Sequence, residues 1–112
     1  MRAKTTMLRW VALLGIAALA PAGNPARADD AGAVLAGRTI ATTWCANCHL
    51  VTAAQASGSD QAPPWSGIAN RAGTTSETLH AFLAKPHGKM PDFKLGVTDI
   101  DNVTAYILSL KN

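Results

Sequence analysis

Residues 45–49 read Cys45-Ala46-Asn47-Cys48-His49. At about 3.6 residues per turn, two cysteines three positions apart emerge from the same face of a helix. Their sulfur atoms can therefore bond to two carbons on one edge of a flat ligand, and His49 can swing beneath that ligand. The chain has only these two cysteines, so all of its cysteine chemistry belongs to this pair.

The C-x-x-C-H spacing is typical of the covalent attachment of c-type haem. It predicts thioether bonds from Cys45 and Cys48 to the porphyrin, with His49 as the proximal iron ligand. Weaker interpretations are a thioredoxin-type redox pair, half of a zinc site, or structural thiols. The sequence lacks the βαβ pattern of a thioredoxin, and neither His80 nor His87 has the spacing of a zinc ligand. We therefore expect one covalently bound haem c.

The first 28 residues have the layout of a secretory signal peptide. A positively charged start is followed by an apolar run from Trp10 to Ala20 and by small residues that end in Ala26-Arg27-Ala28. The apolar run is shorter than the roughly 20 residues that a membrane-spanning helix needs. We expect cleavage after Ala28, with Ala22 as the second candidate. Residues 1–28 are then a cleavable signal, and residues 29–112 are a monohaem domain in the periplasm without stable membrane insertion.

The net charge of +3 is concentrated in that leader. Four of the ten basic residues lie in residues 1–28, which contain no Asp or Glu, so residues 29–112 carry six basic and seven acidic side chains, a net charge of −1. A nucleic-acid partner is therefore not expected. A domain this small builds a limited core, and a disulfide between Cys45 and Cys48 would close too short a loop to stabilise it much. A bound porphyrin would supply the apolar core.

The expected fold class is all-α, because apolar residues recur at helical spacing in four segments and no alternating strand pattern is present. The first predicted helix takes Asp29 or Asp30 as its N-cap and continues to Cys48. A short second helix is expected over residues 66–71.

The third predicted helix begins after Thr74 or Thr75, with Glu77 completing a capping box, and it ends before Pro86. Its expected buried face consists of Leu79, Phe82 and Leu83. The fourth opens at Thr98, with Asp101 in the N3 position three residues further on. Its expected buried side consists of Ile100, Val103, Tyr106, Ile107 and Leu110.

A sixth iron ligand would be a thioether or an imidazole far along the chain. Met90 is the only methionine of residues 29–112, and it lies in a loop that contains proline and glycine. Such a loop can bring its sulfur over the ring from the side opposite His49, so Met90 is the predicted distal ligand. Weaker alternatives are a core-filling role for Met90 or iron binding by His80 or His87.

Over residues 30–111 the chain resembles the class I c-type cytochromes of the short bacterial kind. The resemblance rests on the C-x-x-C-H stretch at 45–49 and on the downstream pair Met90-Pro91. It implies the cytochrome c fold, with about four short helices packed around one covalently attached haem.

The resemblance also assigns roles to residues outside the motif. Gly37 should lie where the N-terminal and C-terminal helices cross, and Tyr106 should belong to the C-terminal helix. The carbonyl of Pro63 or Pro64 should accept a hydrogen bond from His49, which would raise the basicity of the imidazole toward iron. The sequence leaves open which proline does so.

Aromatic packing is the point at which the chain departs from the family pattern. The family often has an aromatic residue four positions before the first cysteine, where this chain has Ala41, so Trp44 or Tyr106 is expected to fill that space. Trp65 and Trp44 are weaker candidates for hydrogen bonds to the haem propionates, since tryptophans in small cores are more often packing residues.

A haem iron held by His49 and Met90 has no open position for a substrate, and no distal acid or base is identifiable. We therefore expect a periplasmic electron carrier, not an enzyme, that exchanges single electrons with a dehydrogenase, a terminal oxidase or a reductase. Alternatives are a dedicated cytochrome c subunit of a periplasmic dehydrogenase complex and a ligand-binding or peroxidatic haem protein. The expected state is a monomer or one subunit of a heterodimer. Three lysines that bracket Met90 are candidates for partner docking: Lys85, Lys89 and Lys94.

Overall fold

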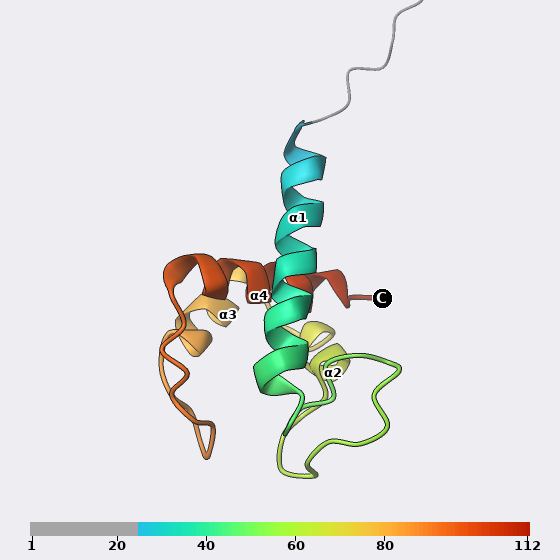
Figure 1. The fold of residues 1–112 in the computed structure, drawn as a ribbon, viewed down its shortest axis with the longest axis vertical. Coiled ribbons are helices and arrows are strands. Elements are labelled where there is room, and N and C mark those ends of the chain that lie inside the picture. Colours follow the sequence, from blue (N-terminus) through green and yellow to red (C-terminus); the bar gives the residue numbers. More distant parts are fainter. Residues whose placement is uncertain (1–24) are drawn as a thin grey trace, which may run out of the picture.

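The computed structural model describes the backbone of residues 25–112 and the side chains from Asp30 onward. This part of the chain contains four α-helices, one π-helical segment and no strand, so the all-α prediction is confirmed. The elements are α1 (Pro25–Ile40), η1 (Ala41–Cys45), α2 (Trp65–Ala69), α3 (Ser76–Leu83) and α4 (Val97–Ser109) (Figure 1).

Most of the predicted signal peptide, residues 1–24, lies outside the described residues, so the signal and its cleavage remain predictions. Within the described residues, no helix combines the length and apolar character needed to span a bilayer.

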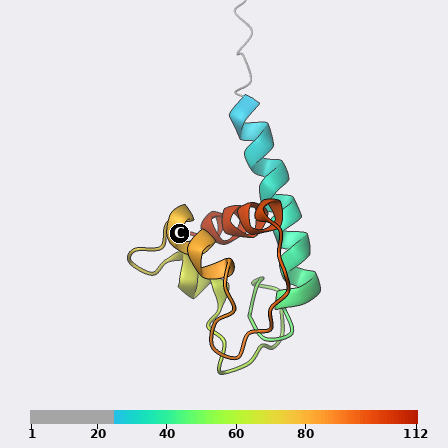
Figure 2. The ribbon, with the colours of Figure 1, turned by 90° about the vertical axis from the view of Figure 1, so that its left-hand side faces the viewer.

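The crossing of α1 and α4 organises the fold, and both ribbon views show α4 running across α1 (Figures 1 and 2). Gly37 is buried at the crossing. A Cβ atom on Gly37 would lie 1.9 Å from the carbonyl oxygen of Asn102 and 2.9 Å from the Cβ of Tyr106. Only glycine allows so close an approach of the two backbones, and the predicted crossing at Gly37 is confirmed.

The core lies along the inner side of α4, where Val103 is fully buried and Tyr106 and Ile107 are nearly so. The Tyr106 hydroxyl donates a hydrogen bond of 2.7 Å to the carbonyl of Val51, which ties α4 to the loop after η1. Ala41 is also fully buried in this cluster, whereas Trp44 is 42% exposed. Of the two aromatic residues expected to fill the space near Ala41, Tyr106 therefore lies in the core and Trp44 does not.

The predicted N-cap of α1, the capping-box partner in α3 and the start of α4 require correction. α1 begins at Pro25, so neither Asp29 nor Asp30 is its N-cap. Proline is favoured in the first helical turn, and the alanines that follow it extend a helix well. The third helix is capped by Thr75, as one alternative predicted, but the partner in its capping box is Thr78 and not Glu77.

α4 begins at Val97 with Gly96 as its N-cap, so its start lies two residues before the predicted one, which had Thr98 three residues ahead of Asp101. Asp99 takes the position assigned to Asp101, and its Oδ2 accepts a hydrogen bond from the Gly96 amide at 3.3 Å. The hydrophobic pattern predicted the buried side of α4 well, but it fixes a helix end only to within a residue or two.

Two other predictions about the helices differ from the structure. Helical structure ends at Cys45 instead of continuing to Cys48, and residues 46–48 of the C-x-x-C-H stretch form a turn beyond the helix. In α3 only Leu79 is buried, Leu83 is half-buried, and Phe82 is 58% exposed. Phe82 borders a large cavity and does not pack between helices.

Two long loops complete the molecule. Residues 46–64 connect η1 to α2, and residues 84–96 connect α3 to α4. Both loops extend to the same side of the helices, away from the N-terminal end of α1 (Figures 1 and 2). The functional site lies between them.

Candidate haem site

The end of the first helical unit presents the C-x-x-C-H stretch. Thr43 donates a hydrogen bond of 2.7 Å to the carbonyl of Thr39, and Thr42 makes similar bonds one residue earlier. Such side chains compete for helical carbonyls and bend helices, and here the last turn widens into the π-helical segment η1. π-Helical turns are frequent at functional sites. The turn continues through Cys48 and His49, whose amides both donate to the carbonyl of Cys45 at 3.1 and 2.9 Å.

The orientation of His49 follows from a bond to the opposite loop. Its Nδ1 lies 2.8 Å from the carbonyl oxygen of Pro63. A carbonyl can only accept, so Nδ1 must carry the proton, and Nε2 of the neutral ring keeps its lone pair. The structure thereby decides between the two candidate prolines in favour of Pro63. This arrangement leaves His49 able to bind a metal through Nε2.

A cavity of about 750 Å³ lies beside this turn. Cys45 contributes to its wall from the end of η1, Cys48 and His49 from the first loop, and Met90 from the loop between α3 and α4. The structure therefore brings together all four of the predicted site residues. Further lining residues are mainly apolar and include Trp65, Ile68, Leu79, Phe82, Leu83, Phe93 and Ile107.

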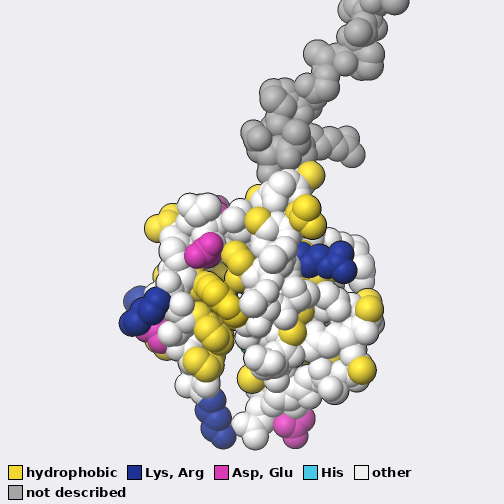
Figure 3. Space-filling view, viewed as in Figure 1, with side chains coloured by type: hydrophobic (Ala, Val, Ile, Leu, Met, Phe, Trp, Pro, Cys, Tyr) yellow, Lys and Arg dark blue, Asp and Glu magenta, His cyan; other side chains and the backbone are white. Residues whose placement is uncertain are grey.

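The cavity fits the group that the motif implies. Its volume falls within the range of roughly 300–1,000 Å³ found for sites that take cofactors and ligands of this size. In Figure 3 hydrophobic side chains gather in a band between α1 and the 84–96 loop. A flat apolar ring with one polar edge matches such a lining, because several polar side chains also border the cavity: Ser59, Gln61, Arg71, Thr74 and Thr78. The sequence pattern gave no signal that these polar residues would meet at one site.

The two cysteines differ in exposure, with Cys45 buried and Cys48 exposed. Burial, and secondarily the neighbouring Cys48, raises the pKa of the Cys45 thiol to about 11. Reactive redox cysteines have a lowered thiol pKa, so the surroundings of Cys45 do not favour a redox pair.

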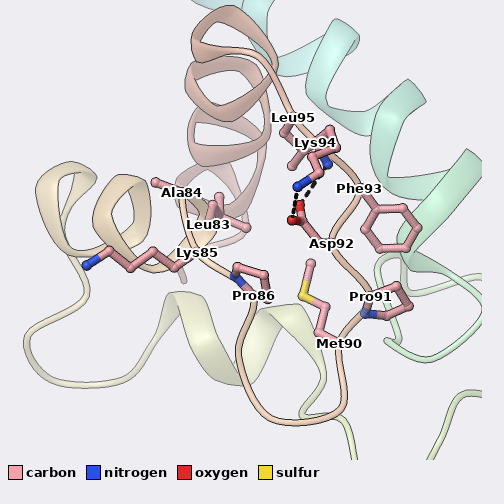
Figure 4. A pocket seen from close by; sticks show the side chains of 10 residues that line it. All are labelled: Leu83, Ala84, Lys85, Pro86, Met90, Pro91, Asp92, Phe93, Lys94 and Leu95. Atoms are coloured by element: carbon pink, nitrogen blue, oxygen red, sulfur yellow. Dashed lines mark hydrogen bonds and ion pairs between the residues drawn. The ribbon is translucent and has the colours of Figure 1, made fainter.

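Met90 lies in the wall between two cavities, since it also borders a smaller cavity of about 210 Å³. Figure 4 shows its side chain between Pro86 and Pro91, with Phe93 on the side toward α1. The loop turns tightly before Met90, whose amide donates to the carbonyl of His87 at 3.0 Å across Gly88, a residue with a φ of +54°.

The two histidines considered as alternative ligands differ in position. His87 borders the large cavity, and its ring lies 4.0 Å from that of Phe82, measured between centroids. His80 is on α3, where its Nε2 lies 3.4 Å from a carboxylate oxygen of Asp101 on α4. It is not among the residues that line the cavity.

Both candidate tryptophans border the cavity, but their surroundings differ. Trp65 is 3% exposed, and its ring centroid lies 6.0 Å from those of His49 and Tyr106. Trp44 stacks on Phe93 with 6.1 Å between centroids and 11° between planes. Trp65 therefore packs beside His49, and Trp44 connects η1 to the Met90 loop. Their proposed bonds to haem propionates remain predictions.

The three lysines near Met90 differ in their contacts. Lys94 donates to Asp92 at 2.6 Å, and this bond lowers the pKa of the Asp92 carboxyl. Lys89 donates to the side-chain oxygen of Gln61 at 3.1 Å, which joins the two loops at the cavity. The unbalanced positive charge of this loop therefore comes from Lys85 and Lys89.

Comparisons with known proteins also indicate a haem protein. The family model described as "Cytochrome C oxidase, cbb3-type, subunit III" matches residues 32–107. The chain is 40% identical over 104 residues to the protein named Cytochrome c-552 from Bradyrhizobium diazoefficiens, an alignment that covers 93% of this chain and 95% of the relative. No solved structure matches the chain. The chain therefore belongs to this family and is a small monohaem c-type cytochrome that carries covalently bound haem c.

Proposed function

We propose that this cytochrome is an exported electron carrier of the periplasm whose haem iron is held by His49 and Met90. The observation that carries the proposal is the cavity between the two loops, because His49 and Met90 border it from different loops. The Nδ1–H bond to Pro63 leaves Nε2 of His49 as the donor atom. Met90 offers a thioether from a loop tied to the other wall by Lys89 and Gln61.

The haem supplies one reversible electron, and the chain sets the conditions for its transfer. Cys45 and Cys48 hold the porphyrin edge, and the Pro63 carbonyl fixes the ring of His49. A thioether ligand favours reduced iron and raises the reduction potential. Apolar side chains, Trp65 and Phe82 among them, line the cavity and would lie against the porphyrin.

We favour a free carrier over an enzyme-bound subunit because the relative that aligns over nearly all of both chains is named as a cytochrome, Cytochrome c-552. A ligand-binding or peroxidatic function would require Met90 to leave the iron.

The test is a titration of the holoprotein after expression with a haem-c maturation system. We expect reversible reduction by one electron and no spectral change when carbon monoxide is added to the reduced protein, because Met90 occupies the sixth position. Rapid and complete carbon monoxide binding by the folded protein would contradict the carrier function and favour a ligand-binding haem.

A further inference from the structure

Gln55 is the side chain that organises the loop after the haem-binding turn. Its Oε1 accepts a hydrogen bond from the amide of Val51 at 3.0 Å. Its Nε2 lies 2.9 Å from the carbonyl of Ala46 and 2.8 Å from those of His49 and Ser57. One amide side chain thus connects four main-chain groups that are spread over residues 46–57.

These contacts satisfy groups that have no partner in regular structure. Residues 50–64 form neither helix nor strand, yet Val51 is only 1% exposed. A buried amide without a partner costs about 1–3 kcal/mol. Gln55 supplies that partner for Val51. The main-chain amide of Gln55 also donates a hydrogen bond of 3.3 Å to the carbonyl of Thr52, and this bond turns the chain back toward the haem-binding turn.

His49 is anchored at three of its four polar atoms. Its amide donates to the carbonyl of Cys45 at 2.9 Å, its carbonyl accepts from Gln55 at 2.8 Å, and its Nδ1 lies 2.8 Å from the carbonyl of Pro63. Within the described residues, only Nε2 makes no hydrogen bond, and His49 borders the cavity. The partners of the His49 amide and of Nδ1 are main-chain carbonyls. Among the described residues, Gln55 is therefore the one side chain that hydrogen-bonds to His49.

We propose that Gln55 is a positioning residue for the haem site, which holds the main chain of His49 so that Nδ1 stays bonded to Pro63 and Nε2 faces the iron. The inference rests on the proposed function in one respect, namely that His49 binds iron. Groups that orient a metal-bound histidine raise its basicity as a ligand. Without Gln55 the bond from His49 to Pro63 should weaken, the imidazole should become a poorer donor, and the oxidised iron should lose stability.

The main variant is Gln55→Glu, which keeps the length of the side chain and the acceptor for Val51 but loses the amide donor. Ala56→Glu is the matched control, because it adds the same charge one residue away on an exposed side chain. Gln55→Leu is a neutral second variant in case charge repulsion prevents folding. The measurements on each holoprotein are the hyperfine-shifted ring-proton resonances of His49 in the oxidised state and the reduction potential.

We expect shifted and broadened His49 ring resonances in both Gln55 variants and unchanged ones in Ala56→Glu. The reduction potential of Gln55→Glu should be higher than that of Ala56→Glu, and the potential of Gln55→Leu higher than that of the unmodified protein. Unchanged ring resonances, or potentials that are not raised, would overturn the inference even if the melting temperature falls. A wild-type holoprotein without hyperfine-shifted histidine resonances would instead overturn the proposed ligation by His49.

Discussion

Gly37 is the residue at which a single added methyl group should disturb the whole fold. In Gly37→Ala the new Cβ would overlap the Asn102 carbonyl, so α1 and α4 must separate. Overpacking of this kind costs about 1–3 kcal/mol, occasionally more, and denaturant unfolding of the holoprotein should show that loss of stability.

Gly32→Ala is the matched control, because it changes the same helix at a point where nothing lies within 4 Å of the new atom. It should leave stability unchanged or raise it by up to about 1 kcal/mol, the helix-propensity difference between alanine and glycine. Equal stabilities of the two variants would show that α1 and α4 do not pack as closely as described.

The sequence predicted which four residues would meet at the site, and all four border the cavity. Cys45, Cys48 and His49 were selected from one motif, and Met90 because it is the only methionine of residues 29–112. The choice of Pro63 over Pro64 and the contacts of Gln55 could not be predicted. Both depend on how an irregular loop of small and polar residues folds back, and such a loop has no periodic pattern from which its course can be predicted.

At the scale of elements, hydrophobic periodicity predicted the four helices and the buried side of α4. It assigned Phe82 to the same buried face as Leu79 because both fit the helical spacing. Both side chains border the cavity, but Leu79 is buried in the core cluster whereas Phe82 is 58% exposed. A cofactor cavity and a protein core select the same apolar residues, so spacing alone does not distinguish them.

The loop that carries Met90 is held to the haem-binding turn by the stacking of Phe93 on Trp44. Trp44→Ala removes this contact, and we expect the Met90 loop to open more often. The rate at which imidazole binds to the oxidised holoprotein should rise several-fold, in line with an aromatic pair worth about 0.5–1.5 kcal/mol. Stopped-flow absorption measures this rate directly.

Leu35→Ala provides the comparison for that experiment, because Leu35 is 66% exposed and is not among the cavity-lining residues. Its imidazole binding rate should equal that of the unmodified protein. If Trp44→Ala also leaves the rate unchanged, the stacked pair does not hold the loop.

At the scale of the whole molecule, charge near the Met90 loop should guide small redox reagents. Lys89 borders the cavity, and the charge of Lys94 is offset by Asp92. Lys89→Glu should therefore slow oxidation by an anionic iron hexacyanide and speed oxidation by a cationic cobalt complex. Both effects should shrink as salt rises, because exposed charges are screened over about 10 Å at 0.1 M ionic strength.

Arg38→Glu makes the same change of charge on α1, at a residue that is not among those lining the cavity. It should alter the two rates less than Lys89→Glu does. Equal effects of the two variants would mean that overall charge, and not the surface near Met90, controls the encounter.

The absorption spectra of the oxidised holoprotein and its Met90→Ala variant test directly whether Met90 and His49 hold the haem iron. The unmodified protein should show the weak long-wavelength band of sulfur-to-iron charge transfer. Met90→Ala should lack that band and have a lower reduction potential, because the thioether that stabilises reduced iron is gone. A band and potential that are the same in both proteins would contradict this account and assign the sixth position to another residue.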